Sequence, residues 1–266
     1  MLRKHAKIEP ERFYYHCDQL GMLVWQDMVN GGSAYKHWFV TYLATLMNWN
    51  HISFSDDEKH AGLLSRLHPE GKDEFRREIT ETIAFLYNHP SIVVWVPFNE
   101  GWGQFDALAA CEQIRTLDSS RLIDHASGWF DQKGGDILSL HYYFLKLKFK
   151  PESKRAAALT EFGGYSLSIP GHSCCKKVYG YKKFNSTGAL TYGYIDLIRQ
   201  TILPAVKKGI GATVYTQLSD IEEETNGIYT YDREICKIDP DTLRKWNRAL
   251  KEAGECKTYA DHPTDH

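Results

Sequence analysis

The sequence lacks an excess of charge of either sign. Its 266 residues include 32 lysines and arginines against 34 aspartates and glutamates, a formal net charge of −2. Nucleic acids and anionic membrane surfaces are both bound largely through clustered positive charge. The composition therefore gives no reason to expect nucleic acid or a membrane as a partner.

Long hydrophobic runs are also missing. No apolar stretch reaches the length that spans a bilayer, and the N-terminus has no basic region followed by an apolar segment, the pattern of a secretory signal. From this alone the chain is either cytoplasmic or lacks its true start, so the localisation stays open between the cytoplasm and the periplasm or exterior.

Several sequence motifs that would indicate a bound cofactor or metal are absent as well. The six cysteines show neither the spacing of a disulfide framework nor that of a paired zinc motif. Gly31-Gly32-Ser33 matches neither a dinucleotide-binding fingerprint nor a P-loop. No H-x-H pair ends an early strand, which disfavours a metal-dependent barrel hydrolase despite twelve histidines. We therefore expect no metal and no organic cofactor.

What the sequence does contain is an alternation of short apolar runs with helical patterns. Strands are predicted at residues 22–28, 92–98, 121–127, 136–143, 157–162 and 211–218, with another at 2–5. Helices are predicted at residues 10–20, 35–47, 72–88, 105–117 and 190–208, the last interrupted at Pro204, and after the Asp239-Pro240 cap. This order is typical of parallel βαβ units. The length fits one domain over residues 1–266, and the fold class expected is α/β, a (β/α)₈ TIM barrel short of one strand.

Two glutamates close two of these strands. Glu100 follows Asn99 at the end of the strand at 92–98, and Glu161 lies at the end of the strand at 157–162. Active sites of such barrels lie at the C-terminal strand ends, so both carboxylates are expected to face one cavity. Glycoside hydrolysis needs such a pair, one to protonate the leaving oxygen and one to meet the developing oxocarbenium ion. Asn99 could donate a hydrogen bond to the sugar 2-hydroxyl.

Other polar and aromatic residues at strand ends are weaker candidates for binding the sugar. They are Asp27, His125, Trp129, His141, Tyr142 and Gln217. Asp220 also closes the last strand, and Arg3 and His5 could line the pocket floor. The run Glu222-Glu223-Glu224 is most simply a solvated loop, although it lies near the expected barrel mouth. Each of these side chains could instead be buried and hydrogen-bonded for stability.

Three segments carry a resemblance to a known family. They are RFYYHCDQLGMLVWQDM at residues 12–28, NHPSIVVWVPFNEGWG at 88–103 and TEFGG at 160–164. These resemble glycoside hydrolase family 2, which contains β-galactosidases, β-glucuronidases and β-mannosidases, and the likeness runs from about Met1 to Asp232.

The resemblance implies a role for the residues that match the family's motifs. Glu100 would be the acid/base on barrel strand four, Asn99 the contact to the 2-hydroxyl, and Glu161 the nucleophile on strand seven. The family often has a tyrosine near the nucleophile and a tryptophan at the end of strand eight, where this sequence has Gln217. The resemblance also implies that residues 2–5 form strand two, so that strand one and the preceding β-sandwich domains are expected to be missing.

The expected function is a retaining exo-β-glycosidase acting on a carbohydrate substrate. The alternative is an inactive or purely carbohydrate-binding barrel, which the missing strand would favour because it leaves two unpaired sheet edges. The sequence identifies neither the sugar nor the oligomeric state.

Overall fold

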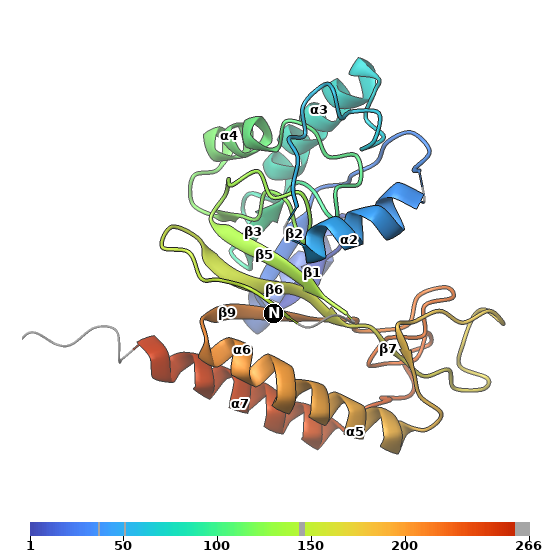
Figure 1. Cartoon of the computed structure of the whole chain (residues 1–266). Coiled ribbons are helices and arrows are strands. Elements are labelled where there is room, and N and C mark those ends of the chain that lie inside the picture. The colour runs from blue at the N-terminus through green and yellow to red at the C-terminus, as the bar shows by residue number, and fades with distance from the viewer. Residues whose placement is uncertain (37, 51, 144–146, 259–266) are drawn as a thin grey trace, which may run out of the picture. The chain divides into compact units, whose positions relative to one another are not determined.

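The structure is a computed structural model that describes residues 1–36, 38–50, 52–143 and 147–258 (Figure 1). The chain divides into two compact units, Met1–Leu140 and His141–His266, and the division falls inside strand β5 (Ile137–Tyr142). Strands and helices alternate as predicted up to residue 123, but from there to residue 183 the described strands follow one another with no helix between them.

A four-stranded sheet forms the centre of the first unit. Its strands are β1 (Leu2–Lys4), β2 (Val24–Asp27), β3 (Ile92–Val96) and β4 (Leu122–Ile123). They are hydrogen-bonded in that order and every pair is parallel. The spatial order follows the order in sequence, as expected when each strand leads through a crossover connection to the next. All four predicted strands are confirmed, with shorter bounds than predicted.

Strand β4 is much shorter than the predicted strand at residues 121–127. Backbone pairing with β3 extends to Asp124, whose N donates to Trp95 O (3.0 Å). It resumes after a gap, where Ser127 N donates to Phe98 O (2.8 Å) and Glu100 N donates to Ser127 O (2.9 Å). A parallel bridge joins Asn99 and Ser127. The prediction of one unbroken strand over residues 121–127 was therefore wrong.

Helices cover the sheet of the first unit and form its core with it. They are α1 (Glu11–Leu20), α3 (Pro69–Leu86) and α4 (Ala107–Leu117). Ile79 and Ile83 of α3 and Ile114 of α4 are at most 2% exposed, and they belong to one cluster with Ile92 and Trp95 of β3. As predicted, α1 stops at Gly21, which has a left-handed conformation (φ 64°). A π-helical turn, η1 (Trp38–Leu43), leads into α2 (Ala44–Trp49) in the predicted helical region.

A three-stranded sheet with the strand order β5-β6-β9 contains the main strands of the second unit. In it β6 (Ala156–Gly163) and β9 (Ile210–Thr216) are parallel. Figure 1 shows α5 (Thr187–Leu197), α6 (Leu203–Lys207) and α7 (Pro240–Thr258) along one side of this sheet. The ring of Tyr215 on β9 packs 5.5 Å from those of Phe162 and Tyr194, which joins sheet and helices. A short ladder of β7 (Tyr165–Ser166) with β8 (Lys182–Lys183) was not predicted.

Both helix signals predicted near the C-terminus are confirmed. Helices α5 and α6 are joined by a π-helical turn, η2 (Ile198–Ile202), which ends two residues before Pro204. Proline has no N–H and crowds the carbonyl four residues earlier, and a π turn is one way in which a helix accommodates this. At α7, Thr242 N donates to Asp239 Oδ2 (2.7 Å), so that Asp239 caps the helix.

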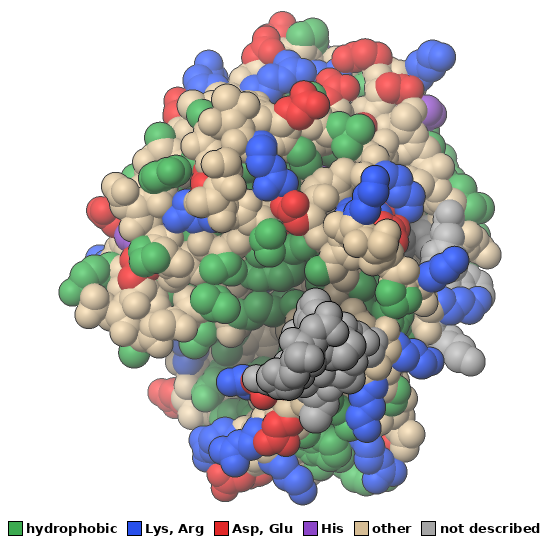
Figure 2. Space-filling model, turned by 90° about the vertical axis from the view of Figure 1, so that its left-hand side faces the viewer, with side chains coloured by type: hydrophobic (Ala, Val, Ile, Leu, Met, Phe, Trp, Pro, Cys, Tyr) green, Lys and Arg blue, Asp and Glu red, His purple; other side chains and the backbone are tan. Residues whose placement is uncertain are grey.

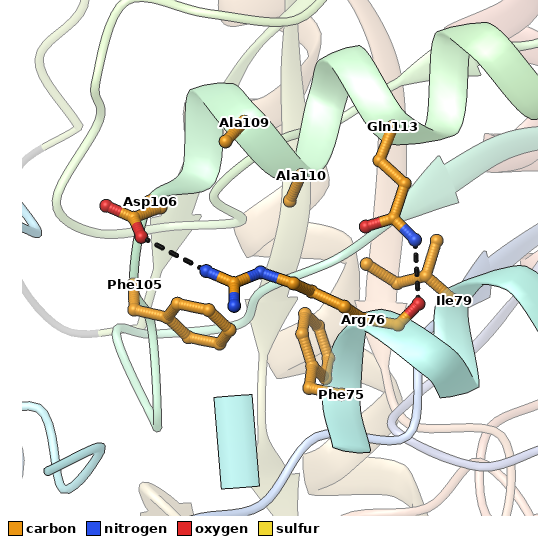
Figure 3. A pocket seen from close by; sticks show the side chains of 8 residues that line it. All are labelled: Phe75, Arg76, Ile79, Phe105, Asp106, Ala109, Ala110 and Gln113. Carbon is orange, nitrogen blue, oxygen red and sulfur yellow. Dashed lines mark hydrogen bonds and ion pairs between the residues drawn. The ribbon is translucent and has the colours of Figure 1, made fainter. Parts of the chain in front are cut away.

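Two views show parts of the surface of the described residues. On the face in Figure 2, acidic and basic side chains lie side by side, with hydrophobic ones between them. Figure 3 shows a small crevice between α3 and α4, where Arg76 pairs with Asp106 (3.5 Å) and Gln113 donates to Arg76 O (2.7 Å). Its lining residues Phe75 and Phe105 also pack against Phe98, two residues after the end of β3, with ring centroids 5.0 and 5.7 Å away. Among the described helices, none has the length and hydropathy of a transmembrane span.

Candidate active site

Glu100 lies in the turn four residues beyond the end of β3, the strand after which the acid/base was predicted. Its backbone has a left-handed conformation (φ 51°), which is unusual for a residue with a side chain. Gly101 and Gly103 follow with φ 71° and 64°, and a Cβ on Gly101 would lie 2.3 Å from the ring of Phe130. Backbone strain at non-glycine residues is concentrated at functional sites. The turn therefore holds Glu100 in a conformation that an ordinary loop would avoid.

A buried ion pair lies beside this turn in the first unit. Arg3 Nε and Nη2 donate to the two carboxylate oxygens of Asp27 (3.0 and 2.9 Å), and Arg3 Nη2 also donates to Asn99 Oδ1 (2.8 Å). His5 Nδ1 lies 3.4 Å from Asp27 Oδ2. Burial opposes ionisation of Asp27, but the Arg3 charge and hydrogen bonds from His5 and Arg3 hold its pKa below the ordinary value. Asp27 is thus a charged partner of Arg3. Through Arg3, these contacts join β1 and the C-terminal ends of β2 and β3.

Arg3 also fixes which way the Asn99 amide faces. A guanidinium can only donate, so the amide oxygen of Asn99 must face it, and the amide nitrogen is turned away. That nitrogen is the group a sugar hydroxyl would accept from. Sequence reasoning gave Arg3 only a weak place at the pocket floor. The available sign of its role was the position of a charged residue, Arg3, inside a short strand.

A second buried carboxyl, Asp124, was missed from the sequence. It is fully buried, and its Oδ2 accepts a hydrogen bond from Ser139 Oγ (3.0 Å), which lies 3.2 Å from Ser127 Oγ. Burial raises the pKa of Asp124, and the nearby Arg3 charge only partly offsets this. In the sequence Asp124 lies within a predicted strand, and nothing there distinguished it from a residue of an ordinary core strand.

His125 and Trp129, two predicted sugar contacts, are both buried. His125 is 1% exposed; its Nε2 accepts from Gln132 N (3.0 Å) and lies 3.1 Å from Asp131 Oδ1. Trp129 is 9% exposed and packs in a cluster with Phe39, Ala44, Leu64 and Phe130. The described contacts are those of packing and loop anchoring, and a role in sugar binding stays a prediction.

In the second unit, Glu161 lies near the C-terminal end of β6 with two polar neighbours. Tyr143 Oη donates to Glu161 Oε2 (2.5 Å) and is also 3.1 Å from Thr216 Oγ1. His141 Nδ1 lies 3.6 Å from the same carboxylate oxygen, and 15% of the Glu161 side chain is exposed. The tyrosine hydroxyl holds the carboxylate in one orientation.

The tyrosine that contacts Glu161 is the residue after the one chosen from the sequence. Side chains of a strand alternate between its faces, so His141 and Tyr143 share one face and Tyr142 lies on the other. Tyr142 is close enough to Tyr165 to affect its pKa, which burial raises. The predicted pocket role of His141 is compatible with this placement, whereas Tyr143 was overlooked.

Gln217 follows β9 and belongs to a polar cluster. Its Nε2 donates to Glu224 Oε2 (3.0 Å) and to Asn226 Oδ1 (2.6 Å), and Asn226 Nδ2 donates to Glu224 Oε2 (3.4 Å). We call these three residues the strand-eight cluster. Glu224, which the sequence suggested was a solvated loop residue, is half-buried and hydrogen-bonded.

A buried lysine fixes the loop that carries this cluster. Lys237 is 0% exposed, and its Nζ donates to Asp220 Oδ1 (2.6 Å), Leu167 O (3.0 Å) and Thr225 O (2.9 Å). Burial lowers the pKa of Lys237 and raises that of Asp220, while their attraction opposes both shifts. Asp220, predicted at the strand end, is therefore structural, and Lys237 was not noticed in the sequence.

One surface group in the second unit could in principle hold a metal ion. Ligand atoms of His172, Asp232 and Glu234 lie within 4.8 Å of one another. His172 Nδ1 is 2.7 Å from Asp232 Oδ2, and hydrogen bonds from Thr230 and others lower the pKa of Asp232 to about 2. The contact between His172 and Asp232 is that of a surface ion pair.

Comparison with known families finds one matching model. The model described as "Glycosyl hydrolases family 2, TIM barrel domain" matches residues 9–203. Among curated proteins, β-mannosidase B of Thermothelomyces thermophilus is 32% identical over 94 residues, which are 35% of this chain and 8% of that protein. The β-galactosidase of Leuconostoc mesenteroides is 26% identical over 263 residues, 93% of this chain and 22% of that protein. The chain thus spans less than a quarter of the length of these relatives.

Solved structures share the fold at low sequence identity. A β-glucuronidase of Ruminococcus gnavus matches with a TM-score of 0.62 and 14% identity over 94% of this chain and 44% of that one. A β-galacturonidase of Eisenbergiella tayi, bound to galacturonate, matches with a TM-score of 0.57 and 17% identity over 96% of this chain and 44% of that one. With the family model, these confirm the predicted TIM-barrel class, although the described strands form separate sheets and not one closed barrel.

Proposed function

The chain belongs to glycosyl hydrolase family 2 through its TIM-barrel domain, and from that premise we propose that it is a retaining exo-β-glycosidase. Members of this family act as glycosidases on β-linked sugars, so the hydrolase class follows from membership. The retaining mechanism, the exo action and the roles of individual residues are the proposal.

Glu161 is the proposed nucleophile. In its charged form it attacks the anomeric carbon and forms a glycosyl-enzyme, while Glu100 gives its proton to the departing glycosidic oxygen. Glu100, now a carboxylate, then takes a proton from water, and the water oxygen attacks the anomeric carbon and releases Glu161. Two inversions at the same carbon return the starting configuration. No metal or organic cofactor takes part in this route.

The observation that carries the proposal is the setting of Glu161. Its carboxylate lies near the C-terminal end of a barrel strand, where this fold places its chemistry, and accepts a hydrogen bond from Tyr143 Oη at 2.5 Å. The 3.6 Å distance to His141 Nδ1 adds a second polar neighbour on the same side. A nucleophilic carboxylate must be held in one orientation, and these neighbours favour that.

The first unit supports the assignments of Glu100 and Asn99. The left-handed turn at Glu100 immediately follows Asn99, whose amide oxygen is held by Arg3. The amide nitrogen of Asn99 is thereby the donor that remains for the 2-hydroxyl, where a hydrogen bond strengthens in the transition state.

A panel of nitrophenyl β-glycosides tests the function. We expect the chain to hydrolyse at least one of them, and Glu161→Gln or Glu100→Gln to lower kcat by about a thousandfold or more, comparable to the loss of a catalytic group elsewhere. Glu112→Gln, on the exposed face of α4, makes the same chemical change and should leave kcat unchanged.

Azide separates the two catalytic roles. With Glu100→Ala and a nitrophenyl leaving group that needs no acid, azide should attack the glycosyl-enzyme, release Glu161 and give a β-glycosyl azide. Sugar binding by the folded protein without hydrolysis of any glycoside would instead favour a non-catalytic carbohydrate-binding barrel.

A further inference from the structure

Cys174 and Cys175 place two thiol groups side by side in the loop between β7 and β8. Their Sγ atoms are 3.6 Å apart, and Cys174 is exposed. A tetrahedral zinc ion holds each of its thiolate ligands at about 2.3 Å, which puts two of them about 3.8 Å apart. The two sulfur atoms therefore already have nearly the spacing that one such ion requires.

A disulfide between the same two residues is geometrically less favourable. The Cα atoms of neighbouring residues are about 3.8 Å apart, whereas a disulfide usually joins Cα atoms about 4.4–6.8 Å apart. A bond between adjacent cysteines is strained and more easily reduced for that reason. The pair is thus better suited to sharing one ion than to forming a stable cross-link.

Negative charge near the two thiols also favours a cation over disulfide exchange. The pKa of the Cys175 thiol is raised, first by its hydrogen bond with Cys174 and further by the negative charges of Glu223 and Glu222. The nucleophile in disulfide exchange is the thiolate, which a raised pKa makes scarce. The same carboxylates attract a cation, and a bound metal ion itself deprotonates a coordinating thiol.

Hydrogen bonds fix the loop that carries the two thiols. Cys174 Sγ donates to Glu222 O (3.2 Å), and further along the loop Tyr179 N donates to Glu223 O (2.6 Å). Thr225 N donates in turn to Tyr179 O (3.2 Å). The loop is thus tied to the segment that carries the strand-eight cluster. A site that is ordered before its ligand arrives loses less entropy on binding.

We propose that Cys174 and Cys175 form a binding site for one soft divalent cation, such as Zn²⁺ or Cd²⁺, held by both sulfur atoms. Thiolates are the ligands that soft ions select. On binding, two metal–sulfur bonds form and both S–H protons pass to water, so that the ion and the two thiolates together carry no net charge. Cys174 then no longer donates to Glu222 O. The inference is independent of the proposed function, whose route uses no metal.

Cadmium binding reads out sulfur coordination directly. Cd²⁺ held by thiolates gives an ultraviolet charge-transfer band, which a site of nitrogen and oxygen ligands lacks. With the reduced, metal-free protein we expect this band to grow and saturate as Cd²⁺ is added. Cys174→Ser and Cys175→Ser should each raise the Kd at least about tenfold, because even groups outside a ligand set contribute this much. Cys236→Ser, whose thiol donates to Ile238 O (3.0 Å), is the matched control and should leave the Kd unchanged.

A further variant separates this site from the surface group of His172, Asp232 and Glu234. In calorimetric titrations with Zn²⁺, the tightest binding event should be lost in Cys174→Ser/Cys175→Ser and kept in His172→Ala. Both variants should retain the circular dichroism spectrum of the wild type, because the changes lie in a loop. The absence of a charge-transfer band in the wild type, a band that persists in the double variant, or loss of the tightest Zn²⁺ event in His172→Ala would overturn the inference.

Discussion

Replacing Lys237 by methionine removes a buried cation that joins three segments of the second unit. The methionine fills a similar volume, but Asp220, with 1% of its side chain exposed, loses its counter-ion at 2.6 Å. The carbonyls of Leu167 and Thr225 lose a donor at 3.0 and 2.9 Å. Breaking a buried pair by removing one partner costs about 3–5 kcal/mol, because the remaining charge is left without compensation.

Urea unfolding followed by circular dichroism measures this cost. We expect Lys237→Met to lower the free energy of unfolding of the second unit by about 4 kcal/mol. Lys251→Met on the exposed face of α7 should change it by no more than about 0.5 kcal/mol. The double variant Lys237→Met/Asp220→Leu should recover most of the loss, because it leaves no unpaired charge.

The pH dependence of the Lys237→Met variant gives an independent check. Burial already raises the pKa of Asp220, and losing the Lys237 charge raises it further. A raised folded-state pKa means that the folded protein takes up a proton more readily than the unfolded chain, so the penalty is present above that pKa. The stability deficit of the variant should therefore be largest near neutral pH and shrink in acid. A loss below about 1 kcal/mol at neutral pH, or one independent of pH, would refute this reasoning.

Three further changes test other contacts. Tyr143→Phe removes the hydroxyl that donates to Glu161 at 2.5 Å, and should lower kcat by about 10- to 100-fold in a steady-state assay with little change in thermal stability. Because the pKa of Asp27 is lowered in the folded state, the wild-type protein gains stability above about pH 4 and loses it as the pH falls through the folded-state pKa. In the Asp27→Asn variant the free energy of unfolding should therefore depend less on pH in this acid range. Gly101→Ala should lower the melting temperature, because the backbone φ is 71° and the new Cβ would lie 2.3 Å from the ring of Phe130. Gly188→Ala in α5, where a Cβ would have no neighbour within 4 Å, should leave it unchanged. Equal melting temperatures of the two variants would contradict this.

The sequence predicted those parts of the fold that depend on local rules. Gly21 ends α1 and Asp239 caps α7 because each residue satisfies or terminates its own helix without help from distant segments. The apolar runs located the strands, and in the first unit the order of the strands in the sheet follows their order in the sequence. Membership of glycoside hydrolase family 2, inferred from three segments, is confirmed.

The orientation of side chains at the strand ends was harder to predict. In β5 the polar residues Ser139 and His141 alternate with Leu138 and Leu140, and this pattern, continued past the strand, would have placed Tyr143 on the face of His141. Asp124 gave no comparable signal, because it is buried in a strand region that resembles core.

Contacts between distant loops were beyond local reasoning. Lys237 meets Asp220 and Leu167 only after the chain has folded, and Glu224 meets Gln217 across a turn whose shape the composition does not fix. A lysine between Cys236 and Ile238 in an apolar stretch was a possible sign of burial.

The most direct test of the central claim is to trap the glycosyl-enzyme. A 2-deoxy-2-fluoro glycoside with a good leaving group forms the intermediate and slows its hydrolysis, because the fluorine destabilises the oxocarbenium-like transition state. Cleavage after Arg155 and Lys176 gives a peptide of residues 156–176 in which Glu161 is the sole acidic side chain. We predict that mass spectrometry finds the sugar on this peptide in the wild type and not in Glu161→Gln. Turnover of the parent glycoside with the label on another peptide, or with no label at all, would contradict the account.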